Sequence, residues 1–320
     1  MSEALVTGAT GFLGSRLCRR LVDRGWSVTA TRRAESDVSV LADVDVEWVH
    51  ADVLDGDAVH EAVAGHDRVF HLAGVGLASA DAETVRRVNE EGTRLVVEAC
   101  EAAGVERLLF TSTAGTRRRS DGKPADETDH AEPIGAYQES KAAAERVVDR
   151  AADRGLDAVT VHPTSVFGPG DEEFTGRLLR LALDPRMVAY LPGGASFVSL
   201  DDAVDGVLAA MEHGTAGEHY LLGGENLPYG DALGVIADHG DGHRPPLRVP
   251  ATLIHAAGPV VGVLNDVTGL RLFPFDGEMA RLATRKLFYS SAKAERDLGY
   301  AARPLGSHVK ETIEWYRRED

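Results

Sequence analysis

The N-terminal segment combines an apolar run with regularly spaced glycines: Ala4-Leu5-Val6-Thr7-Gly8-Ala9-Thr10-Gly11-Phe12-Leu13-Gly14. The pattern predicts a short strand, a tight turn and a helix that begins near Phe12. Glycines are needed where the turn is tight, where a pyrophosphate approaches the backbone and where the helix packs on the sheet. The first amides of such a helix carry the positive end of its dipole and can bind phosphate. We therefore expect a dinucleotide to bind here, although a glycine-rich turn without a ligand has the same spacing. The expected contacts are Gly8, Thr10, Gly11, Phe12, Leu13 and Gly14.

Strand and helix patterns alternate through the first half of the chain. Apolar runs predict strands at Ala4–Thr7, Ser27–Thr31, Val46–Ala51, Arg68–Leu72, Arg107–Ser112 and Ala158–His162. Amphipathic runs predict helices at Phe12–Arg24, Asp57–Ala64, Glu83–Ala103 and Ala136–Arg154. This alternation is typical of an α/β fold with a doubly wound parallel sheet of the Rossmann type. Ligands of such sheets bind at the carboxyl ends of the strands.

The alternation loosens after Pro163. A helix is expected at Glu173–Leu183, and Phe197–Leu200 and Glu218–Leu222 are expected to be strands that return to the sheet around a helix at Asp202–His213. We therefore predict a dinucleotide-binding domain made of residues 1–165 and 197–223. Residues 166–196 and 224–320 would form a smaller, discontinuous C-terminal lid that binds the substrate.

The chain is strongly acidic. Its 51 Asp and Glu residues against 34 Lys and Arg residues give a formal net charge of −17 over 320 residues. A field of this sign repels nucleic acid and anionic membranes, so neither is expected as a partner. An acidic, solvated surface suits high salt, where the screening length falls to roughly 3 Å at 1 M. We expect a halophilic protein; an acidic mesophilic protein is the alternative.

Cysteine usage and the N-terminal sequence indicate the compartment. Cys18 and Cys100 lie in predicted helices without metal-binding or redox spacing, as is typical of core residues in a reducing compartment. The N-terminus enters a strand directly and leaves no room for a signal peptide. The apolar run Leu253–Leu264 is too short to cross a bilayer. We therefore expect a cytoplasmic protein. His239 and His243 have ligand-type spacing but no further ligand nearby, so no metal site is expected.

The end of the second predicted strand indicates which dinucleotide is bound. NAD sites of this type place Asp or Glu there, for the hydroxyls of the adenosine ribose. Here Arg32 and Arg33 occupy that place, and guanidinium groups can bind a 2′-phosphate and stack on adenine. NADP(H) is therefore expected in preference to NAD(H). The alternative for Arg33 is a solvated loop charge.

Two further strand ends would contribute to the same site. Asp52, followed by Val53, would either touch the adenine amino group or cap the next helix. Leu72-Ala73-Gly74 would run beneath the adenosine ribose, where small residues leave room. His71 is expected to be a packed strand residue rather than a catalyst.

Tyr137 and Lys141 open a predicted helix and share one face of it. A phenol ionises at about pH 10, and a nearby ammonium and a nicotinamide cation favour the phenolate. Lys141 would also reach the nicotinamide ribose. Thr111-Ser112-Thr113 ends the fifth predicted strand, where a hydroxyl can hold a substrate oxygen against the tyrosine. Thr113 is our first choice for that hydroxyl and Ser112 the second; for both, the alternative is a hydrogen bond to local backbone.

Together these motifs resemble the extended, epimerase-like branch of the short-chain dehydrogenase/reductase superfamily over nearly the whole chain. Within that branch the chain is similar to dihydroflavonol-4-reductase-like and hopanoid-associated sugar epimerase proteins, through Ile134–Tyr137, Leu222–Asn226 and Ser290–Glu295. The resemblance implies an NAD(P)-binding fold and a Thr113–Tyr137–Lys141 triad. It also implies that Asn89 is the fourth member of a proton relay. The cofactor contacts that it implies are Thr111, Tyr137, Lys141, Pro163 and Val166.

Several positions depart from the family pattern. Thr113 stands where the family usually has serine, and His162-Pro163 stands where extended enzymes often have Arg-Pro. Ala114-Gly115 replaces the acidic pair of the sugar-nucleotide 4,6-dehydratases, so dehydration is not expected. Asn89 is an unusual residue for a helix interior, and we expect it to hold a backbone carbonyl or a water molecule.

The sequence therefore predicts an NADP(H)-dependent oxidoreductase that moves hydride between nicotinamide and a carbonyl or secondary alcohol. The nearest alternative is an NDP-sugar epimerase that retains its cofactor. A second alternative is a cofactor-binding regulatory protein without turnover. The expected partner is a small carbonyl, alcohol or nucleotide-sugar substrate, and the expected assembly is a homodimer through Glu83–Ala103 and Ala136–Arg154. Arg117-Arg118-Arg119 would bind a substrate phosphate or carboxylate or, alternatively, would be solvated loop charges.

Overall fold

The computed structural model describes residues 2–319 with gaps at 77–79, 120, 131, 172–173, 185, 241 and 255–283. Most of the apolar run Leu253–Leu264 lies in the last of these gaps, and Asp241, between His239 and His243, forms another. Within the described ranges, no helix is both long and apolar enough to cross a bilayer.

A parallel sheet of seven strands forms the centre of the fold, with the strand order β10-β6-β5-β4-β1-β2-β3. All neighbouring strands in it pair in parallel. The order reverses between β1 and β4, so the carboxyl ends of these two strands border the crevice where such folds bind ligands. The predicted Rossmann-type fold is confirmed. The strands are β1 (Glu3–Thr7), β2 (Ser27–Arg32), β3 (Glu47–His50), β4 (Arg68–His71), β5 (Arg107–Thr111), β6 (Ala158–Pro163) and β10 (His219–Leu222).

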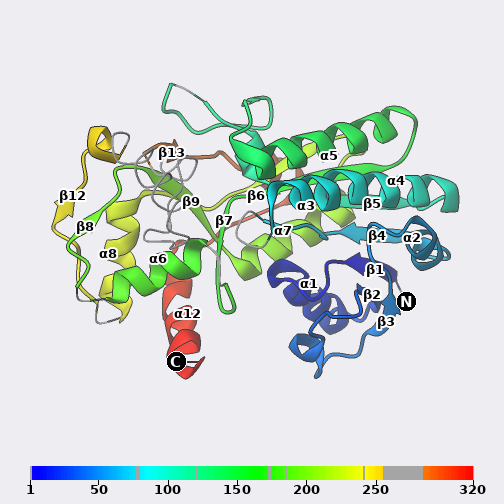
Figure 1. Cartoon of the computed structure of the whole chain (residues 1–320), viewed down its shortest axis with the longest axis horizontal. Coiled ribbons are helices and arrows are strands. Elements are labelled where there is room, and N and C mark those ends of the chain that lie inside the picture. Colours follow the sequence, from blue (N-terminus) through cyan, green and yellow to red (C-terminus); the bar gives the residue numbers. More distant parts are fainter. Residues whose placement is uncertain are drawn as a thin grey trace.

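Helices cover both faces of this sheet (Figure 1). One face is covered by α2 (Gly56–Val63), α4 (Gly92–Ala103) and α5 (Gly135–Asp153), which pack on a core that includes Leu5 and Val69. The other face is covered by α1 (Phe12–Asp23) and α7 (Leu200–His213), over a core that includes Val6 and Phe70. Successive residues of β1 and β4 thus face opposite cores, which is why the inner positions of these central strands are apolar on both faces.

The predicted helix Glu83–Ala103 is interrupted. It consists of α3 (Ala82–Arg86), one π-helical segment, η2 (Arg87–Glu91), and α4. A π-helical turn accommodates an extra residue and often occurs at functional sites. Asn89 lies in this segment and is buried. Asn89, a residue type unsuited to the interior of a regular helix, therefore lies in the π-helical segment.

The parts of the second half that do not join the central sheet or cover it form a smaller unit beside it, on the left of Figure 1. A four-stranded sheet is built around β9, which pairs with β7, β11 and β13, while β8 and β12 form a separate pair. Three helices pack around a core that includes Phe167, Phe197 and Ile313. The elements of this unit are β7 (Ser165–Phe167), α6 (Phe174–Leu183), β8 (Ala189–Tyr190), β9 (Gly194–Ser199), β11 (Glu225–Pro228), α8 (Tyr229–Gly240), β12 (Leu247–Arg248), β13 (Lys286–Leu287) and α12 (Gly306–Glu319). The short helix α11 (Ala292–Leu298) packs instead on α7 and β10 of the central fold.

The prediction that Phe197–Leu200 returns to the central sheet is wrong. β9 belongs to the four-stranded sheet, whereas β10 joins the central sheet beside β6 as predicted. β9 is buried along its whole length. Phe197 packs in the core of the smaller unit and Val198 in the core of the central sheet. An apolar run of this kind identifies a strand but not the sheet that receives it.

Candidate functional site

The glycine turn has backbone contacts that leave no space for side chains. Gly8 has a φ of 73°, and a Cβ atom there would lie 2.6 Å from the backbone nitrogen of Ala73. A Cβ at Gly14 would lie 2.1 Å from the carbonyl oxygen of Gly8, so α1 packs directly on the turn. Gly11 is exposed at the N-cap of α1, and no described side chain caps that helix. The first-turn amides are therefore not taken by a capping group, which fits a bound pyrophosphate.

The loop after β7 comes close to this turn. Gly170 has a φ of 87°, and a Cβ there would lie 4.0 Å from Phe12 Cδ2 at the start of α1. The other predicted cofactor contacts in this region are at least partly buried: Thr10, Phe12, Leu13 and Val166 are half-buried, and Pro163 is buried at the end of β6.

Arg32 and Arg33 lie at the end of β2, as predicted. Arg32 is half-buried, and Arg33 is exposed with its Nε 3.7 Å from a carboxylate oxygen of Glu35. The Arg33 amide donates to Ser36 Oγ at 3.0 Å, which turns the chain after the strand. A phosphate bound at this strand end would compete with Glu35 for Arg33.

Asp52 does not cap the next helix. Its carboxylate accepts from the Leu54 amide at 2.9 Å, and Asp55 is the N-cap of α2, accepting from the Ala58 amide. The capping alternative for Asp52 is therefore wrong, and its adenine contact stays a prediction. Val53 is buried against α4: a Cβ at Gly92 would lie 2.8 Å from Val53 Cγ2.

The end of β4 is held by Thr7 of β1. Thr7 Oγ1 accepts from the Ala73 amide at 3.2 Å and lies 2.7 Å from His71 Nδ1. His71 Nε2 lies 3.0 Å from Thr93 Oγ1 on α4. His71 is fully buried, and burial, with a smaller effect of the Lys141 charge, lowers its pKa to about 3. The interpretation of His71 as a packed strand residue is confirmed. After it the chain becomes more accessible: Leu72 and Ala73 are half-buried and Gly74 is exposed.

Lys141 joins α5 to the end of β5. Its Nζ donates to the backbone carbonyl of Thr111 at 2.9 Å and lies 5.1 Å from the centre of the Phe110 ring. Gly74 leaves room for it, because a Cβ there would lie 3.2 Å from Lys141 Nζ. Burial lowers the pKa of Lys141 to about 8. Tyr137 lies one turn earlier on α5 and is half-buried.

Asn89 connects the loop after β4 with α5. Its Oδ1 accepts from the Val75 amide at 2.9 Å, and its Nδ2 donates to the Val75 carbonyl and to Ser140 Oγ, each at 3.0 Å. Ser140 Oγ in turn donates to the Tyr137 carbonyl at 2.9 Å. Asn89 therefore holds a backbone carbonyl, as expected, and ties this loop to the helical turn that carries Tyr137.

The hydroxyls at the end of β5 have different surroundings. Thr113 Oγ1 accepts from the Gly115 amide at 3.2 Å, at the start of the 3-10 turn η3 (Ala114–Thr116). Ser112 is buried and donates to the carboxylate of Glu145. Thr111 Oγ1 is buried with no hydrogen-bond partner among the residues that the structure describes. Thr113 Oγ1 therefore accepts one hydrogen bond and still has its own proton to donate, whereas Ser112 donates to Glu145.

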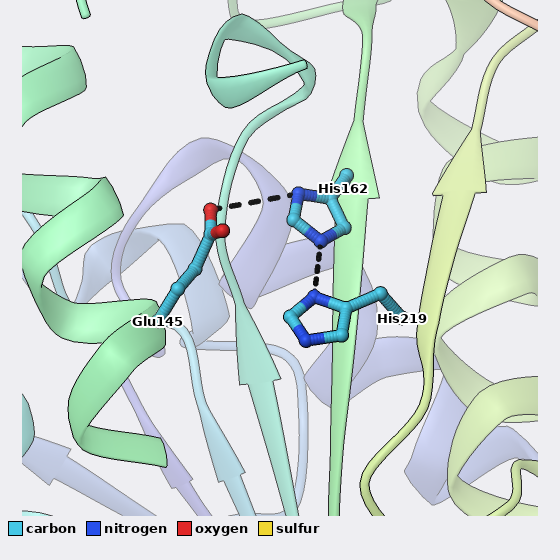
Figure 2. A group of neighbouring side chains, drawn as sticks. All are labelled: Glu145, His162 and His219. Atoms are coloured by element: carbon cyan, nitrogen blue, oxygen red, sulfur yellow. Dashed lines mark hydrogen bonds and ion pairs between the residues drawn. The ribbon is translucent and has the colours of Figure 1, made fainter. Parts of the chain in front are cut away.

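A buried charged cluster lies behind these hydroxyls (Figure 2). Arg117 Nη1 donates to Glu145 Oε2 at 2.9 Å, and the two side chains are only 4% and 6% exposed. His162 lies between Glu145 and His219, with Nδ1 3.7 Å from Glu145 Oε1 and Nε2 2.9 Å from His219 Nδ1. Arg117 Nη2 lies 3.1 Å from the same nitrogen of His219. Sequence reasoning missed this cluster; its only signal was the departure from the family pattern at His162.

The cluster overturns both expectations for Arg117, which neither faces a substrate nor is solvated. Arg119, which pairs with Asp121 and Asp129, fits the alternative of a solvated loop charge. Arg118 is half-buried and donates to the Glu132 carbonyl, and burial lowers its pKa.

Glu145, His162 and His219 are residue types that can bind a metal ion. Glu145 lies beside Nδ1 and His219 beside Nε2 of the His162 ring (Figure 2), and one ligand atom from each of the three residues lies within 4.8 Å of the others. The guanidinium of Arg117 contacts both Glu145 and His219. Arg117 therefore already supplies the positive charge of this cluster.

Comparisons with known proteins agree with this arrangement. Residues 4–223 match the NAD dependent epimerase/dehydratase family. The chain is 32% identical to sterol demethylase protein B of Methylococcus capsulatus, over 98% of both chains. It is 31% identical to a putative dihydroflavonol 4-reductase of Synechocystis, over 98% of this chain and 94% of that protein. The solved structure of gox2253 matches with a TM-score of 0.88 at 35% identity, over 100% of this chain and 99% of that one. The predicted resemblance is confirmed: the chain belongs to the NAD dependent epimerase/dehydratase family and is an NAD(P)-dependent enzyme of the extended short-chain dehydrogenase/reductase type.

Proposed function

We propose that the protein is an NADP(H)-dependent oxidoreductase that interconverts a carbonyl compound and the corresponding secondary alcohol, in the manner of dihydroflavonol-4-reductase-like proteins. The observation that carries this proposal is the 2.9 Å hydrogen bond from Lys141 Nζ to the Thr111 carbonyl. It fixes the helix of Tyr137 and Lys141 against the strand end that bears Thr113. Contacts through Gly74 and Ala73 connect this junction to the glycine turn.

Each side chain then has one task. The nicotinamide, when bound, would supply or accept the hydride. Tyr137 exchanges a proton with the substrate oxygen, and Thr113 donates a hydrogen bond that orients the same oxygen. Lys141 favours the ionised phenol and holds the ribose of the cofactor, while Asn89 fixes the Tyr137 turn and is the fourth member of the relay. The residues proposed to hold the cofactor are Gly8, Thr10, Gly11, Phe12, Leu13, Gly14, Arg32, Arg33, Asp52, Val53, Leu72, Ala73, Gly74, Thr111, Pro163 and Val166.

Arg32 and Arg33 support NADP(H) over NAD(H). They lie at the strand end where an NAD site would have a carboxylate, and Arg32 is half-buried, as a side chain that lines a binding crevice would be. An arginine binds a phosphate group through two parallel hydrogen bonds.

The alternatives use the same residues differently. An NDP-sugar epimerase would return the hydride to the same carbon and consume no cofactor. A dehydratase is disfavoured because Ala114 and Gly115, which carry no carboxylate, follow Thr113. A regulatory protein that binds the cofactor without turnover would have no use for the phenol of Tyr137, one helical turn from Lys141.

The test is a panel of carbonyl compounds and nucleotide sugars followed by NADPH absorbance and by product analysis. We expect one NADPH to be consumed per carbonyl reduced. Tyr137→Phe should lower kcat by about 10²- to 10⁴-fold without weakening NADPH binding. Glu139→Gln, an exposed residue of the same helix, is the control. Sugar epimers formed without NADPH consumption would favour the epimerase, and cofactor binding without any Tyr137-dependent turnover would favour the regulatory protein.

We also propose that the protein works in the cytoplasm, as a homodimer and at high salt. Cys18 and Cys100 are free, buried thiols whose pKa burial raises to about 12, as suits a reducing compartment. The proposed dimer surface on α4 and α5 carries ion pairs such as Arg94–Glu98, so a dimer there would be polar and sensitive to salt. Sedimentation across a series of salt concentrations tests both the assembly and its salt dependence.

A further inference from the structure

Gln138, which directly follows Tyr137 in α5, is the only glutamine in the sequence. It is buried, with 7% of its surface exposed, and its Oε1 accepts from the backbone amide of Ile134 at 2.8 Å. Ile134 is the N-cap of α5, and its side chain does not cap that helix. Because a backbone amide only donates, this contact places the amide oxygen of Gln138 toward Ile134 and turns the NH₂ group elsewhere.

The NH₂ group of Gln138 lies against Gly115, in the turn η3 that follows Thr113. A Cβ atom at Gly115 would lie 3.1 Å from Gln138 Nε2, so the NH₂ group lies where a longer side chain at this position would extend. The Gly115 amide donates to Thr113 Oγ1 at 3.2 Å. The NH₂ group is therefore next to the residue that contacts the Thr113 hydroxyl, and it is carried by the neighbour of Tyr137. These are the two residues proposed to hold the substrate oxygen.

Gln138 Nε2 has no hydrogen-bond acceptor among the residues that the structure describes. The nitrogen is not fully enclosed by protein atoms, so a ligand can reach it. Leaving a largely buried amide donor without an acceptor costs free energy. We infer that Gln138 is a substrate-binding residue, whose NH₂ group donates to a second oxygen of the substrate near the reacting carbonyl. This inference rests on the proposed function, in which Thr113 and Tyr137 hold the first oxygen.

A donor at this place narrows the class of substrate. An NH₂ group donates hydrogen bonds and does not accept them, so it favours a neighbouring ester, carboxylate or hydroxyl oxygen over an alkyl chain. A site that is built to bond such an oxygen rejects an analogue without it, because the buried donor is then left unpaired. We therefore expect 3-oxo esters, 3-oxo acids or 2-hydroxy ketones to be preferred to simple ketones. Ethyl 3-oxobutanoate and heptan-2-one are suitable probes, because their chains have equal length and differ only in the ester group.

Two substitutions separate the donor from the helix contact. Gln138→Glu keeps an oxygen for the Ile134 amide and loses the donor, whereas Gln138→Met loses both. We expect each variant to raise the KM for ethyl 3-oxobutanoate about 10- to 100-fold and to leave the KM for NADPH and for heptan-2-one nearly unchanged. Only Gln138→Met should lower the midpoint of thermal unfolding. An unchanged KM for the ester in Gln138→Glu, or an equal rise for heptan-2-one, would overturn the inference.

A second measurement does not depend on turnover. Because the chain has one glutamine, labelling with side-chain ¹⁵N-glutamine gives a single NH₂ pair in a ¹H–¹⁵N NMR spectrum. With NADP⁺ present, ethyl 3-oxobutanoate should move one of these proton signals downfield, and heptan-2-one should not. No shift with the ester, or equal shifts with both probes, would refute the inference. If the signal moved but no hydride were transferred, the proposed function would fail and the inference would stand.

Discussion

Lys141 donates a hydrogen bond from its buried ammonium to the backbone carbonyl of Thr111, 2.9 Å away, across the junction between α5 and β5. The acceptor is a neutral carbonyl instead of a carboxylate. Burial lowers the pKa of Lys141, and only the charge of the more distant Glu145 acts in the opposite direction. The pKa of Lys141 therefore falls from its usual 10.5 to about 8. The charge that would activate Tyr137 is lost at mildly alkaline pH.

The first prediction is a loss of kcat/KM as pH rises through about 8, because Lys141 is protonated below this pH and neutral above it. Lys141→Arg should remove this alkaline loss, since a guanidinium keeps its charge to beyond about pH 12. The quantity to compare is the pH at which kcat/KM begins to fall, and not the maximal kcat/KM, because the larger arginine side chain will also lower activity. An alkaline limb at the same pH in both proteins would show that another group causes it.

Cofactor choice provides the second prediction. Changing Arg32 and Arg33 together to serine should raise the KM for NADPH about 10- to 100-fold and leave that for NADH nearly unchanged, because only NADPH has the 2′-phosphate. Of the single changes, Arg32→Ser should have the larger effect, because Arg33 already lies beside Glu35. Arg186→Ser is the matched control, because Arg186 is highly exposed and pairs with Asp184, between α6 and β8. Equal effects on both cofactors would contradict the assignment.

The third prediction concerns Gly74. A Cβ there would lie 3.0 Å from Asn89 Oδ1 and 3.2 Å from Lys141 Nζ, slightly closer than ordinary contacts. Gly74→Ala should therefore displace both side chains and lower kcat about tenfold, while the unfolding midpoint changes by less than about 2 °C. Gly56→Ala is the control, because its Cβ would meet only the flexible end of Leu95 at 3.3 Å. Equal kcat in the two variants would show that this junction tolerates movement.

Acid lability is the fourth prediction, and it follows from two buried histidines. The pKa of His71 and of His162 is lowered from 6.5 to about 3. Between these values the unfolded chain binds protons that the native protein does not. The free energy of unfolding should therefore fall as pH decreases, by about 1.4 kcal/mol per pH unit for each histidine. Urea unfolding of His71→Gln should show a slope smaller by that amount, and His50→Gln, at an exposed strand end, is the control. An unchanged slope in His71→Gln would contradict the assignment.

The fifth prediction concerns salt. With a net charge of −17, repulsion between carboxylates should destabilise the native state in dilute buffer, and raising KCl from about 0.1 M to about 2 M should raise the unfolding midpoint. Glucose at matched osmolarity controls for general solute effects. Full stability in dilute buffer, unaffected by salt, would contradict a halophilic origin.

Much of the fold and of the site could be predicted from the sequence because it depends on local spacing. Gly8 is needed where φ is positive, and Gly14 where a helix meets its own preceding turn. A separation of four residues places Tyr137 and Lys141 on one helical face. Alternating strands and helices bring the strand ends to one edge, where Arg32 and Thr111 both lie.

Tertiary structure alone decided contacts between distant segments. β9 is as buried as a central strand, yet it pairs in the second sheet. Arg117 is one of three successive arginines in the sequence, but it is the buried one of the three and pairs with Glu145. Glu145, His162 and His219 come from α5, β6 and β10. Hydropathy and spacing along the sequence indicate whether a residue lies in a helix or a strand. They do not indicate which distant side chain its polar atoms will contact, because that depends on how the helices and strands pack together.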